Sequence, residues 1–321
     1  MKPRVLVTEP IRQAGWDLLQ REAEAVAWAG QGVKPLAGAM ESAQAVIVRA
    51  VRLSADTIRG ATQLKIIAKH GVGYDNIDVA AATAAGVIVT NTPAANSRSV
   101  AEHALALLMV VARRIGECER DLGRRTMRPQ EAYQGVELSG KVMGIIGVGG
   151  AGLRLARMTG HGLGMRVIGY DPHREPWPDG VERFRTLEAL LAEADFLSMH
   201  VPLTPETRNL IGARALARMK PTAILVNTAR GGVVDEAAVA EAIRAGRLGG
   251  AGLDVLVNEP LSADHPLAGL PNVVLTPHTA GVTEEAMVRM ATHAAEEVLR
   301  VLRGERPMFA VNPEVLRSRK G

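Results

Sequence analysis

Short apolar runs alternate with stretches of helical periodicity over the whole chain. In its first part, the runs that predict strands are Val5–Val7, Ala45–Val48, Leu64–Ala68 and Val87–Thr90. A second series is Val142–Ile146, Met165–Tyr170, Phe196–Met199, Ala223–Val226, Ala251–Val255 and Val273–Leu275. Near-continuous apolar strands separated by helices are typical of parallel sheets that helices cover on both faces. The pattern predicts the α/β class, and the second series indicates a dinucleotide-type sheet.

Helix signals lie between these strands. Asp78 is an expected N-cap and Gly86 an expected helix terminator. A long helical pattern begins near Ser99 and ends at about Glu119, and it is expected to connect two units of the chain. Residues 120–138 have little periodicity and contain two glycines and one proline, so they are expected to form an extended loop.

The last helix is expected to begin at Thr283, whose hydroxyl can cap it, and to end at Gly304. Because it follows the final strand, it is free to pack on the first part of the chain. A chain of 321 residues exceeds what one hydrophobic core usually supports. Two compact units are therefore expected.

The composition disfavours several classes of protein. Aromatic residues make up only 3% of the chain, and the net charge of +4 is scattered along it, so nucleic-acid binding is not expected. The longest apolar stretch, residues 104–112, is about half a membrane span, and the apolar run at the N-terminus is too short for a signal peptide. The single cysteine, Cys118, fits a reducing compartment, and we expect the cytoplasm.

A glycine-rich stretch follows the strand Val142–Ile146. Glycine is 33 of 321 residues, so a G-x-G-x-x-G pattern alone is weak evidence, but here a strand enters it and a helix leaves it. Glycines at such a turn let the backbone approach a pyrophosphate, and the helix N-terminus stabilises the anion. The candidate cofactor-binding residues of this loop are Gly147, Gly149, Gly150, Ala151 and Gly152.

Asp171 ends the next strand, 19 residues after Gly152. A carboxylate at this position hydrogen-bonds the adenosine ribose and repels a 2′-phosphate, which predicts NAD as the cofactor. His173 and Arg174 follow closely, so NADP is not excluded. The alternative is an Asp-Pro turn at the surface.

Three polar side chains follow successive strands of the second series: Arg230, Glu259 and His278. Ligands of open α/β sheets bind at the carboxyl ends of the strands. Hydride transfer to a 2-keto acid needs a cation for the carboxylate and an acid that protonates the forming alkoxide. A glutamate hydrogen-bonded to an imidazole favours the protonated ring. The sequence therefore favours these three as a catalytic set, with three unrelated loop residues as the alternative.

The other histidines in turns and helices have no supporting pattern and are expected at the surface. They are His161, His173, His265 and His293. No metal site is expected.

An ordered set of motifs covers nearly the whole chain. The motifs are Gly71–Asp78, Asn91–Pro93, Val100–Glu102, Gly144–Gly152, His200–Thr204, Val226–Gly231, Gly252–Pro260 and Pro277–His278. With these motifs the chain resembles the D-2-hydroxyacid dehydrogenase family, and among its members it looks closest to the phosphoglycerate dehydrogenases.

The resemblance implies a role for each matching residue. Arg230 would bind the substrate carboxylate and polarise its carbonyl, His278 would be the acid/base, and Glu259 would be its partner. The backbone amides of Val72 and Gly73 would hold the substrate carboxylate. The further cofactor-binding residues would be Pro202, Thr204 and Asp254, with Asp254 at the nicotinamide carboxamide.

The resemblance also implies the domain organisation. A flavodoxin-like substrate-binding domain is expected over residues 1–98, completed by 284–321, and a Rossmann NAD-binding domain over 99–283. Members of the family are usually homodimers. Many phosphoglycerate dehydrogenases carry a further regulatory domain, whereas this chain stops at Gly321, so serine feedback is not expected.

The chain departs from the family pattern at two places. Gly150 and Ala151 stand where the family commonly has Arg, Lys or Asn followed by Ile, which should change cofactor affinity more than chemistry. His70 stands where a small apolar residue is common, and we predict that it recognises a polar substituent of the substrate.

Two questions stay open from the sequence. Arg49 and Lys69 are candidates for a second anion site, which would suit phosphoglycerate or a diacid, and solvated surface cations are the alternative. The alternative function is an NAD(H)-sensing interaction protein that resembles the C-terminal binding corepressors. Formate dehydrogenase, on the same scaffold, has glutamine where Glu259 stands, so Glu259 disfavours that chemistry.

Overall fold

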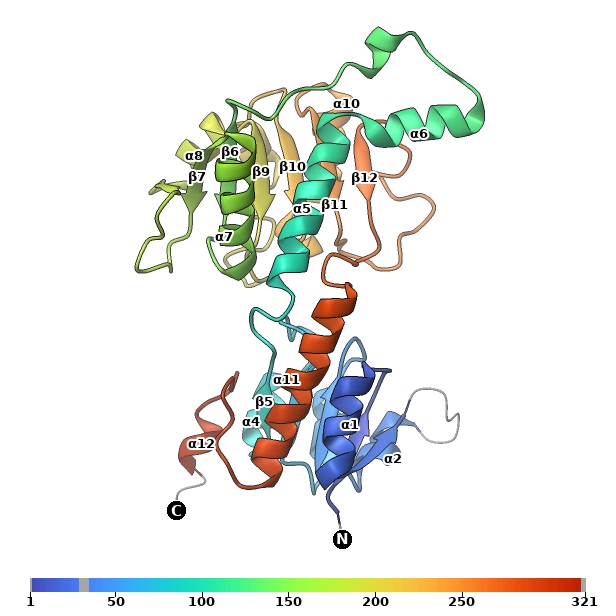
Figure 1. Cartoon of the computed structure of the whole chain (residues 1–321), viewed down its shortest axis with the longest axis vertical. Coiled ribbons are helices and arrows are strands. Elements are labelled where there is room, and N and C mark those ends of the chain that lie inside the picture. Colours follow the sequence, from blue (N-terminus) through green and yellow to red (C-terminus); the bar gives the residue numbers. More distant parts are fainter. Residues whose placement is uncertain (1, 29–34, 319–321) are drawn as a thin grey trace. The chain divides into compact units, whose positions relative to one another are not determined.

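The computed structural model describes residues 2–28 and 35–318. The chain divides into two compact units, one of Met1–Asn96 with Val282–Gly321 and the other of Ser97–Gly281. Each unit has a parallel sheet between two layers of helices (Figure 1). Of the helices within the described ranges, none is both long and apolar enough to span a membrane.

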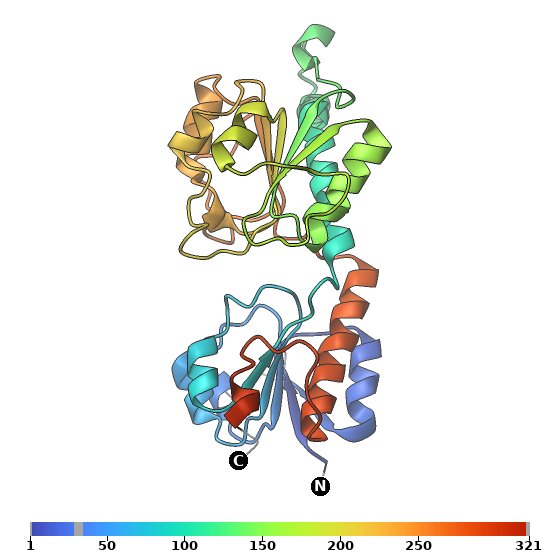
Figure 2. The same ribbon diagram turned by 90° about the vertical axis from the view of Figure 1, so that its left-hand side faces the viewer.

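The first unit contains a five-stranded parallel sheet in the order β2-β1-β3-β4-β5. Its strands are β1 (Arg4–Val7), β2 (Glu24–Ala27), β3 (Ala45–Val48), β4 (Ile66–Lys69) and β5 (Ile88–Thr90). This is the flavodoxin-like order. One face is covered by α1 (Gln13–Glu22) and α11 (Glu284–Leu302), and the other by α2 (Leu36–Met40), α3 (Ala55–Gly60) and α4 (Val79–Ala84) (Figure 2).

The final long helix, α11, begins where the sequence predicted, with Thr283 as its N-cap. The Thr283 hydroxyl accepts a hydrogen bond from the Ala286 N–H at 3.2 Å, and α11 packs against α1, β3 and β4. The chain beyond α11 also joins this unit, because Asn312 Oδ1 accepts the Val89 N–H at 2.8 Å. The short helix α12 (Val315–Ser318) ends the described chain.

The second unit contains a seven-stranded parallel sheet in the order β12-β11-β10-β9-β6-β7-β8. Its strands are β6 (Val142–Ile146), β7 (Arg166–Tyr170), β8 (Glu182–Arg183), β9 (Phe196–Met199), β10 (Ile224–Asn227), β11 (Gly250–Leu253) and β12 (Val273–Leu275). The first six strands have the order of dinucleotide-binding folds, with the switch point between β6 and β9. The predicted fold class, two doubly wound parallel-sheet domains, is confirmed.

Helices cover both faces of this sheet (Figure 2). On one face lie α5 (Ser97–Ala112) and α7 (Gly150–Arg157), which the π-helical segment η2 (Met158–Gly162) continues. On the other lie α8 (Leu187–Glu193), α9 (Ala213–Leu216) and α10 (Glu236–Arg244), preceded by the short η3 (Gly231–Val233).

The helix predicted from Ser99 to Glu119 is in fact two helices. Helix α5 ends at Ala112, Arg114 has a φ of +53°, and α6 (Ile115–Arg124) follows. The Ala112 carbonyl accepts the Val136 N–H at 2.9 Å, so a tertiary hydrogen bond replaces the next helical one. The expected connector role is also wrong, because α5 belongs to the second unit and packs on its strands β10, β11 and β12.

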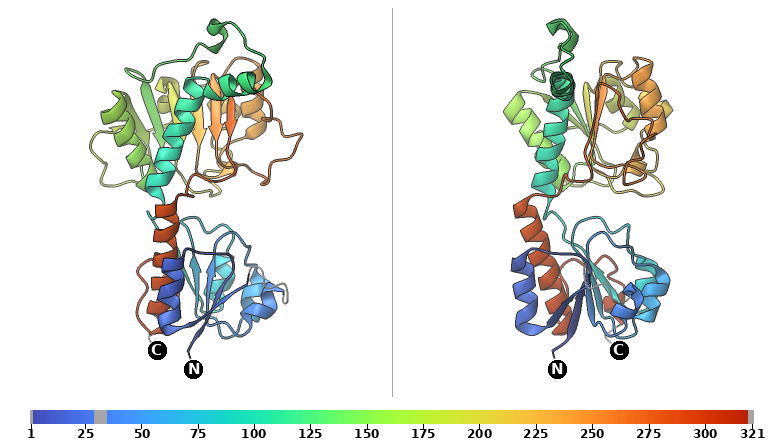
Figure 3. Two further views of the ribbon diagram at one scale, coloured as in Figure 1. Left: turned by 45° about the vertical axis from the view of Figure 1, so that its right-hand side comes forward. Right: turned by 90° about the vertical axis from the view of Figure 1, so that its right-hand side faces the viewer.

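The segment expected as a loop over 120–138 is partly helical. Helix α6 reaches Arg124, and η1 (Gln130–Tyr133) follows it. We call residues 115–137 the arm, because they extend away from the sheet of their own unit (Figure 3). Glu117 is 3% exposed and pairs with Arg114 at 2.9 Å and with Arg128 at 3.0 Å. The pair with Arg128 holds the segment that follows α6 against this helix.

Candidate active site

The glycine-rich turn lies between β6 and α7, at the switch point of the second sheet. Gly147 has a φ of +86°, and a Cβ on it would lie 2.6 Å from the His200 carbonyl oxygen. A Cβ on Gly149, the N-cap of α7, would meet nothing within 4 Å. The turn is therefore closed toward the sheet and open at the helix N-terminus, which fits the approach of a pyrophosphate.

Asp171 follows β7 and faces this turn. Its Oδ2 accepts the Val148 N–H and its Oδ1 the His173 N–H, both at 3.0 Å. The second bond forms an Asx turn, which is compatible with the alternative of an Asp-Pro turn, and the first fixes the carboxylate beside the glycine loop.

Pro202 and Thr204 follow β9, the neighbour of β6 in the sheet. The Thr207 hydroxyl donates to the Pro202 carbonyl at 2.6 Å and accepts the Thr204 N–H at 2.8 Å. These bonds hold Pro202 and Thr204 in one turn at the same edge of the sheet as the glycine loop.

His278 and Glu259 meet at the edge formed by β11 and β12. His278 Nδ1 lies 2.9 Å from Glu259 Oε2, and Glu259 Oε1 accepts the Leu256 N–H at 3.0 Å. The side chains are 50% and 38% exposed, so the pair is open to a ligand. His278 has a φ of +55°, an uncommon backbone conformation for a residue other than glycine.

Arg230 follows β10, the next strand of the same sheet. Its Nη1 donates to the Ala229 carbonyl at 2.6 Å, and its own carbonyl accepts Asn227 Nδ2 at 2.8 Å. A Cβ on the following residue, Gly231, would overlap the backbone of Leu256 and Val257. The turn that carries Arg230 is therefore packed directly on the segment that leads to Glu259.

Asp254 is fully buried behind His278. Its carboxylate accepts the Thr279 and Ala280 N–H groups at 2.8 Å, and its carbonyl accepts the His278 N–H at 2.8 Å. Burial raises the pKa of Asp254, but the hydrogen bonds from His103, Thr276 and the two backbone amides outweigh it and hold the pKa below its usual value. Asp254 thus fixes the turn that presents His278.

Two further members of this network carry no signal in the sequence. Thr276 Oγ1 donates to Asp254 at 2.6 Å, and His103 Nε2 lies 3.0 Å from Thr276 Oγ1 and 3.4 Å from Asp254 Oδ1. Because the Thr276 hydroxyl donates its hydrogen bond to Asp254, it accepts the hydrogen bond from His103 Nε2. Nothing in the spacing of His103 on its helix indicated this partner.

In the first unit, the substrate-loop candidates Val72 and Gly73 follow β4. Asn91 Nδ2 donates to the Val72 carbonyl at 2.7 Å, and the Thr92 N–H donates to the Gly71 carbonyl at 2.9 Å. Both bonds use carbonyls of the loop. Val72 is 38% exposed, so this loop lies at the surface of its own unit.

The ammonium of Lys69 is bonded within the protein. It donates to the Arg49 carbonyl and, at 2.7 Å, to Asn76 Oδ1, and the residue is 9% exposed. Arg49 is half-buried at the end of β3, where its N–H donates to Glu9 Oε2 at 2.9 Å. Lys69 therefore ties the ends of β3 and β4 together.

His70 is 3% exposed. Burial lowers the pKa of His70 to about 4, and the positive charges of Arg49 and Lys69 act in the same direction. A neutral, enclosed imidazole does not favour the prediction that His70 recognises a substituent of the substrate.

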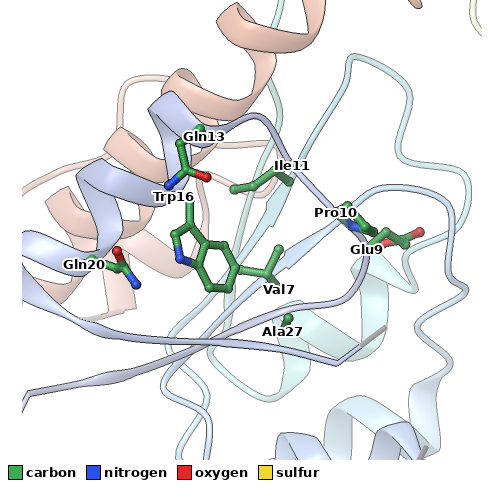
Figure 4. A pocket seen from close by; sticks show the side chains of 8 residues that line it. All are labelled: Val7, Glu9, Pro10, Ile11, Gln13, Trp16, Gln20 and Ala27. Atoms are coloured by element: carbon green, nitrogen blue, oxygen red, sulfur yellow. The ribbon is translucent and has the colours of Figure 1, made fainter. Parts of the chain in front are cut away.

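A hollow lies beside β1 and α1, and Glu9, which accepts the Arg49 N–H, is part of its lining (Figure 4). Its lining shares no residue with the candidates above, and consists of Val7, Glu9, Pro10, Ile11, Gln13, Trp16, Gln20 and Ala27.

Residues 105–280 match the model of the D-isomer specific 2-hydroxyacid dehydrogenase NAD-binding domain. The chain is 42% identical to the glyoxylate reductase of Korarchaeum cryptofilum, over 99% of this chain and 98% of that protein. It is 44% identical to the D-3-phosphoglycerate dehydrogenase of Mycobacterium leprae, over 97% of this chain but only 59% of that protein. This chain thus spans about three fifths of the second relative.

Solved structures resemble the whole chain. A Thermus thermophilus protein superposes with a TM-score of 0.88 at 39% identity, over 96% of this chain and 99% of that one. The NADPH-dependent glyoxylate/hydroxypyruvate reductase of Sinorhizobium meliloti, in complex with NADP and malonate, superposes with a TM-score of 0.84 at 29% identity, over 97% of each chain.

Proposed function

The chain belongs to the D-isomer specific 2-hydroxyacid dehydrogenase family, and we propose that Arg230, Glu259 and His278 carry out its catalysis. It is an oxidoreductase with an NAD-binding domain, and it acts on 2-hydroxy and 2-keto acids. The observation that carries the assignment of residues is the 2.9 Å contact between His278 Nδ1 and Glu259 Oε2 at the carboxyl edge of a dinucleotide-type sheet.

In reduction, each side chain has one task. With Nδ1 bonded to Glu259, His278 Nε2 donates the proton to the forming alkoxide. Glu259 stabilises the imidazolium form before the transfer. Arg230 binds the substrate carboxylate with two parallel hydrogen bonds and polarises the neighbouring carbonyl. In oxidation, the neutral ring of His278 takes the proton back.

The cofactor-binding set consists of Gly147, Gly149, Gly150, Ala151, Gly152, Asp171, Pro202, Thr204 and Asp254. The open turn at the α7 N-terminus fits the pyrophosphate, and Asp171 fits the adenosine ribose. Bound nicotinamide supplies the hydride in reduction and accepts it in oxidation.

Activity with keto acids tests this function. We expect NADH oxidation that depends on a short 2-keto acid, in a panel of glyoxylate, hydroxypyruvate, phosphohydroxypyruvate, pyruvate and oxaloacetate. The interaction-protein alternative predicts a different result, since a pure sensor of NAD(H) binds the cofactor but reduces none of the panel well.

Cofactor selectivity follows from Asp171. NADH should bind at least about tenfold more tightly than NADPH, equal to about 1.4 kcal/mol, because the carboxylate repels a 2′-phosphate. Titration of both cofactors by quenching of tryptophan fluorescence measures the ratio. Equal affinities would remove Asp171 from this role.

The substrate is a second proposal. Arg49 and Lys69 are the candidates for a site that binds a phosphate or distal carboxylate, with the backbone amides of Val72 and Gly73 at the substrate carboxylate. Lys69 also ties two strand ends together, so Lys69→Ala would change the fold of the site as well as its charge. Arg49→Ala is therefore the better test of anion binding.

If Arg49 binds a second anion, phosphohydroxypyruvate exceeds glyoxylate in kcat/KM by about tenfold or more in the wild type, since a charge-assisted hydrogen bond contributes about 1.5–3 kcal/mol. Arg49→Ala removes most of that margin. A matched control is Arg59→Ala, on the surface of the same unit. An unchanged preference ratio in Arg49→Ala would mean that Arg49 does not bind the substrate.

A homodimer formed through the arm completes the proposal. Four large apolar side chains of the arm are strongly exposed: Ile115 (50%), Leu122 (60%), Met127 (75%) and Val136 (40%). Exposed apolar side chains gathered on one segment are typical of a surface that another protein chain buries.

The single cysteine is consistent with the cytoplasm as the location.

A further inference from the structure

Glu259 lies on an exposed segment of the second unit. Residues 257–264 are exposed, whereas the flanking residues Leu256 and His265 are half-buried. A carboxylate that must meet His278 at 2.9 Å needs a fixed backbone, because small displacements weaken a hydrogen bond steeply. The contacts at the two ends of this segment therefore decide where Glu259 stands.

The carboxylate of Glu236 contacts both ends of this exposed segment. Its Oε1 accepts the Val257 N–H at 2.7 Å, two residues before Glu259, and its Oε2 lies 3.0 Å from His265 Nε2. Glu236 is the first residue of α10, where the preceding Asp235 caps the helix by accepting the Ala238 N–H at 3.0 Å. Its side chain is 12% exposed, so most of the bridge is buried.

His265 is the other half of this bridge, and the expectation that it lies at the surface is wrong. Its side chain is 9% exposed. His265 Nδ1 accepts a hydrogen bond from the Leu267 N–H at 3.3 Å. Nε2 therefore bears the ring hydrogen and donates a hydrogen bond to Glu236. Both ring nitrogens of His265 thus anchor the C-terminal end of residues 257–264.

The same region contacts the other catalytic turn. Gly231 packs on the backbone of Leu256 and Val257, which places the Arg230 turn against the end that Glu236 holds. Helix α10 follows directly from that turn through η3. One short stretch of chain, residues 230–236, therefore supports both Arg230 and the position of Glu259.

We propose that Glu236 and His265 are positioning residues for Glu259, holding residues 257–264 so that the Glu259 carboxylate stays on His278. The proposal rests on the proposed role of Glu259. It goes further, because neither residue touches the reacting atoms and each acts through the loop alone.

The pH dependence of keto-acid reduction distinguishes positioning from a general contribution to stability. When Glu259 is no longer held on His278, the imidazolium is less favoured, and the fall of kcat at the basic side moves to lower pH. We expect this shift in Glu259→Gln, in Glu236→Ala and in His265→Ala. Glu236→Ala should also lower kcat by about 10- to 10²-fold, with KM for NADH unchanged.

Two variants serve as matched controls. His265→Gln keeps an amide that can donate to Glu236, so its profile should stay near that of the wild type. Glu241→Gln removes a carboxylate from the same helix, where Glu241 is 77% exposed and pairs with Arg247, and it should change neither kcat nor the profile.

The double variant Glu236→Ala/Glu259→Gln completes the test. If Glu236 acts through Glu259, the double variant has the kcat and profile of Glu259→Gln alone. Should Glu236→Ala leave the profile unshifted, or lower kcat additively with Glu259→Gln, the positioning role is overturned while the proposed function stands. Should Glu259→Gln itself cause no shift, the catalytic assignment of Glu259 fails, and the positioning proposal fails with it.

Discussion

Replacing His278 with alanine or asparagine lowers kcat for keto-acid reduction by about 10²-fold or more, while the Kd for NADH stays near that of the wild type. The reason is that His278 donates the proton to the forming alkoxide, and neither replacement has a group that can act as a general acid. Steady-state kinetics and a separate NADH titration measure the two quantities.

The asparagine variant is needed because of the backbone. His278 has a φ of +55°, which asparagine adopts more readily than alanine, so His278→Asn preserves the turn. His161→Ala, at an exposed position of the same unit, is the control for loss of a histidine. A His278→Asn enzyme that keeps most of its kcat would mean that another group donates the proton.

Arg230→Gln is expected to lower kcat/KM for keto acids by about 10²- to 10⁴-fold. Two charge-assisted hydrogen bonds to the substrate carboxylate contribute about 1.5–3 kcal/mol each, and each 1.4 kcal/mol is tenfold. Arg230→Lys keeps the charge but loses the planar pair of donors, so its kcat/KM should lie between those of the wild type and Arg230→Gln.

Arg214→Gln, at an exposed position on α9, is the matched control and should retain the kcat/KM of the wild type. The Kd for NADH should not change in any of these variants. If Arg230→Gln loses kcat/KM and NADH binding together, Arg230 supports the fold of the site rather than the substrate.

Much of this architecture follows from the sequence, because parallel strands carry a strong local signal. The apolar runs and the polar residues after them could be located, and the contact between His278 and Glu259 could be expected from the meeting of strand ends. The edge strands β2 and β8 escaped prediction. Strand β2 has the sequence Glu-Ala-Val-Ala, in which alanine is a weak strand former, and β8 has only two residues.

What could not be predicted depends on contacts between distant residues. His103 and Thr276 are 173 residues apart, and His265 and Glu236 are 29 apart on different elements. The end of α5 is also set by a distant partner, since Val136 takes the hydrogen bond that would have continued the helix. In each case the residue type was compatible with a surface position, and only the tertiary fold supplies its partner.

Transfer of a labelled hydride from NADH to a 2-keto acid tests the proposed reaction itself. The protein is incubated with a keto acid that it reduces and with NADH deuterated at the transferable position, and the product is examined by mass spectrometry and chiral chromatography. We predict a D-2-hydroxy acid with deuterium on the carbon that bears the new hydroxyl, formed far more slowly by His278→Asn. A product without deuterium, or no conversion of any keto acid, would show that the protein does not catalyse this hydride transfer.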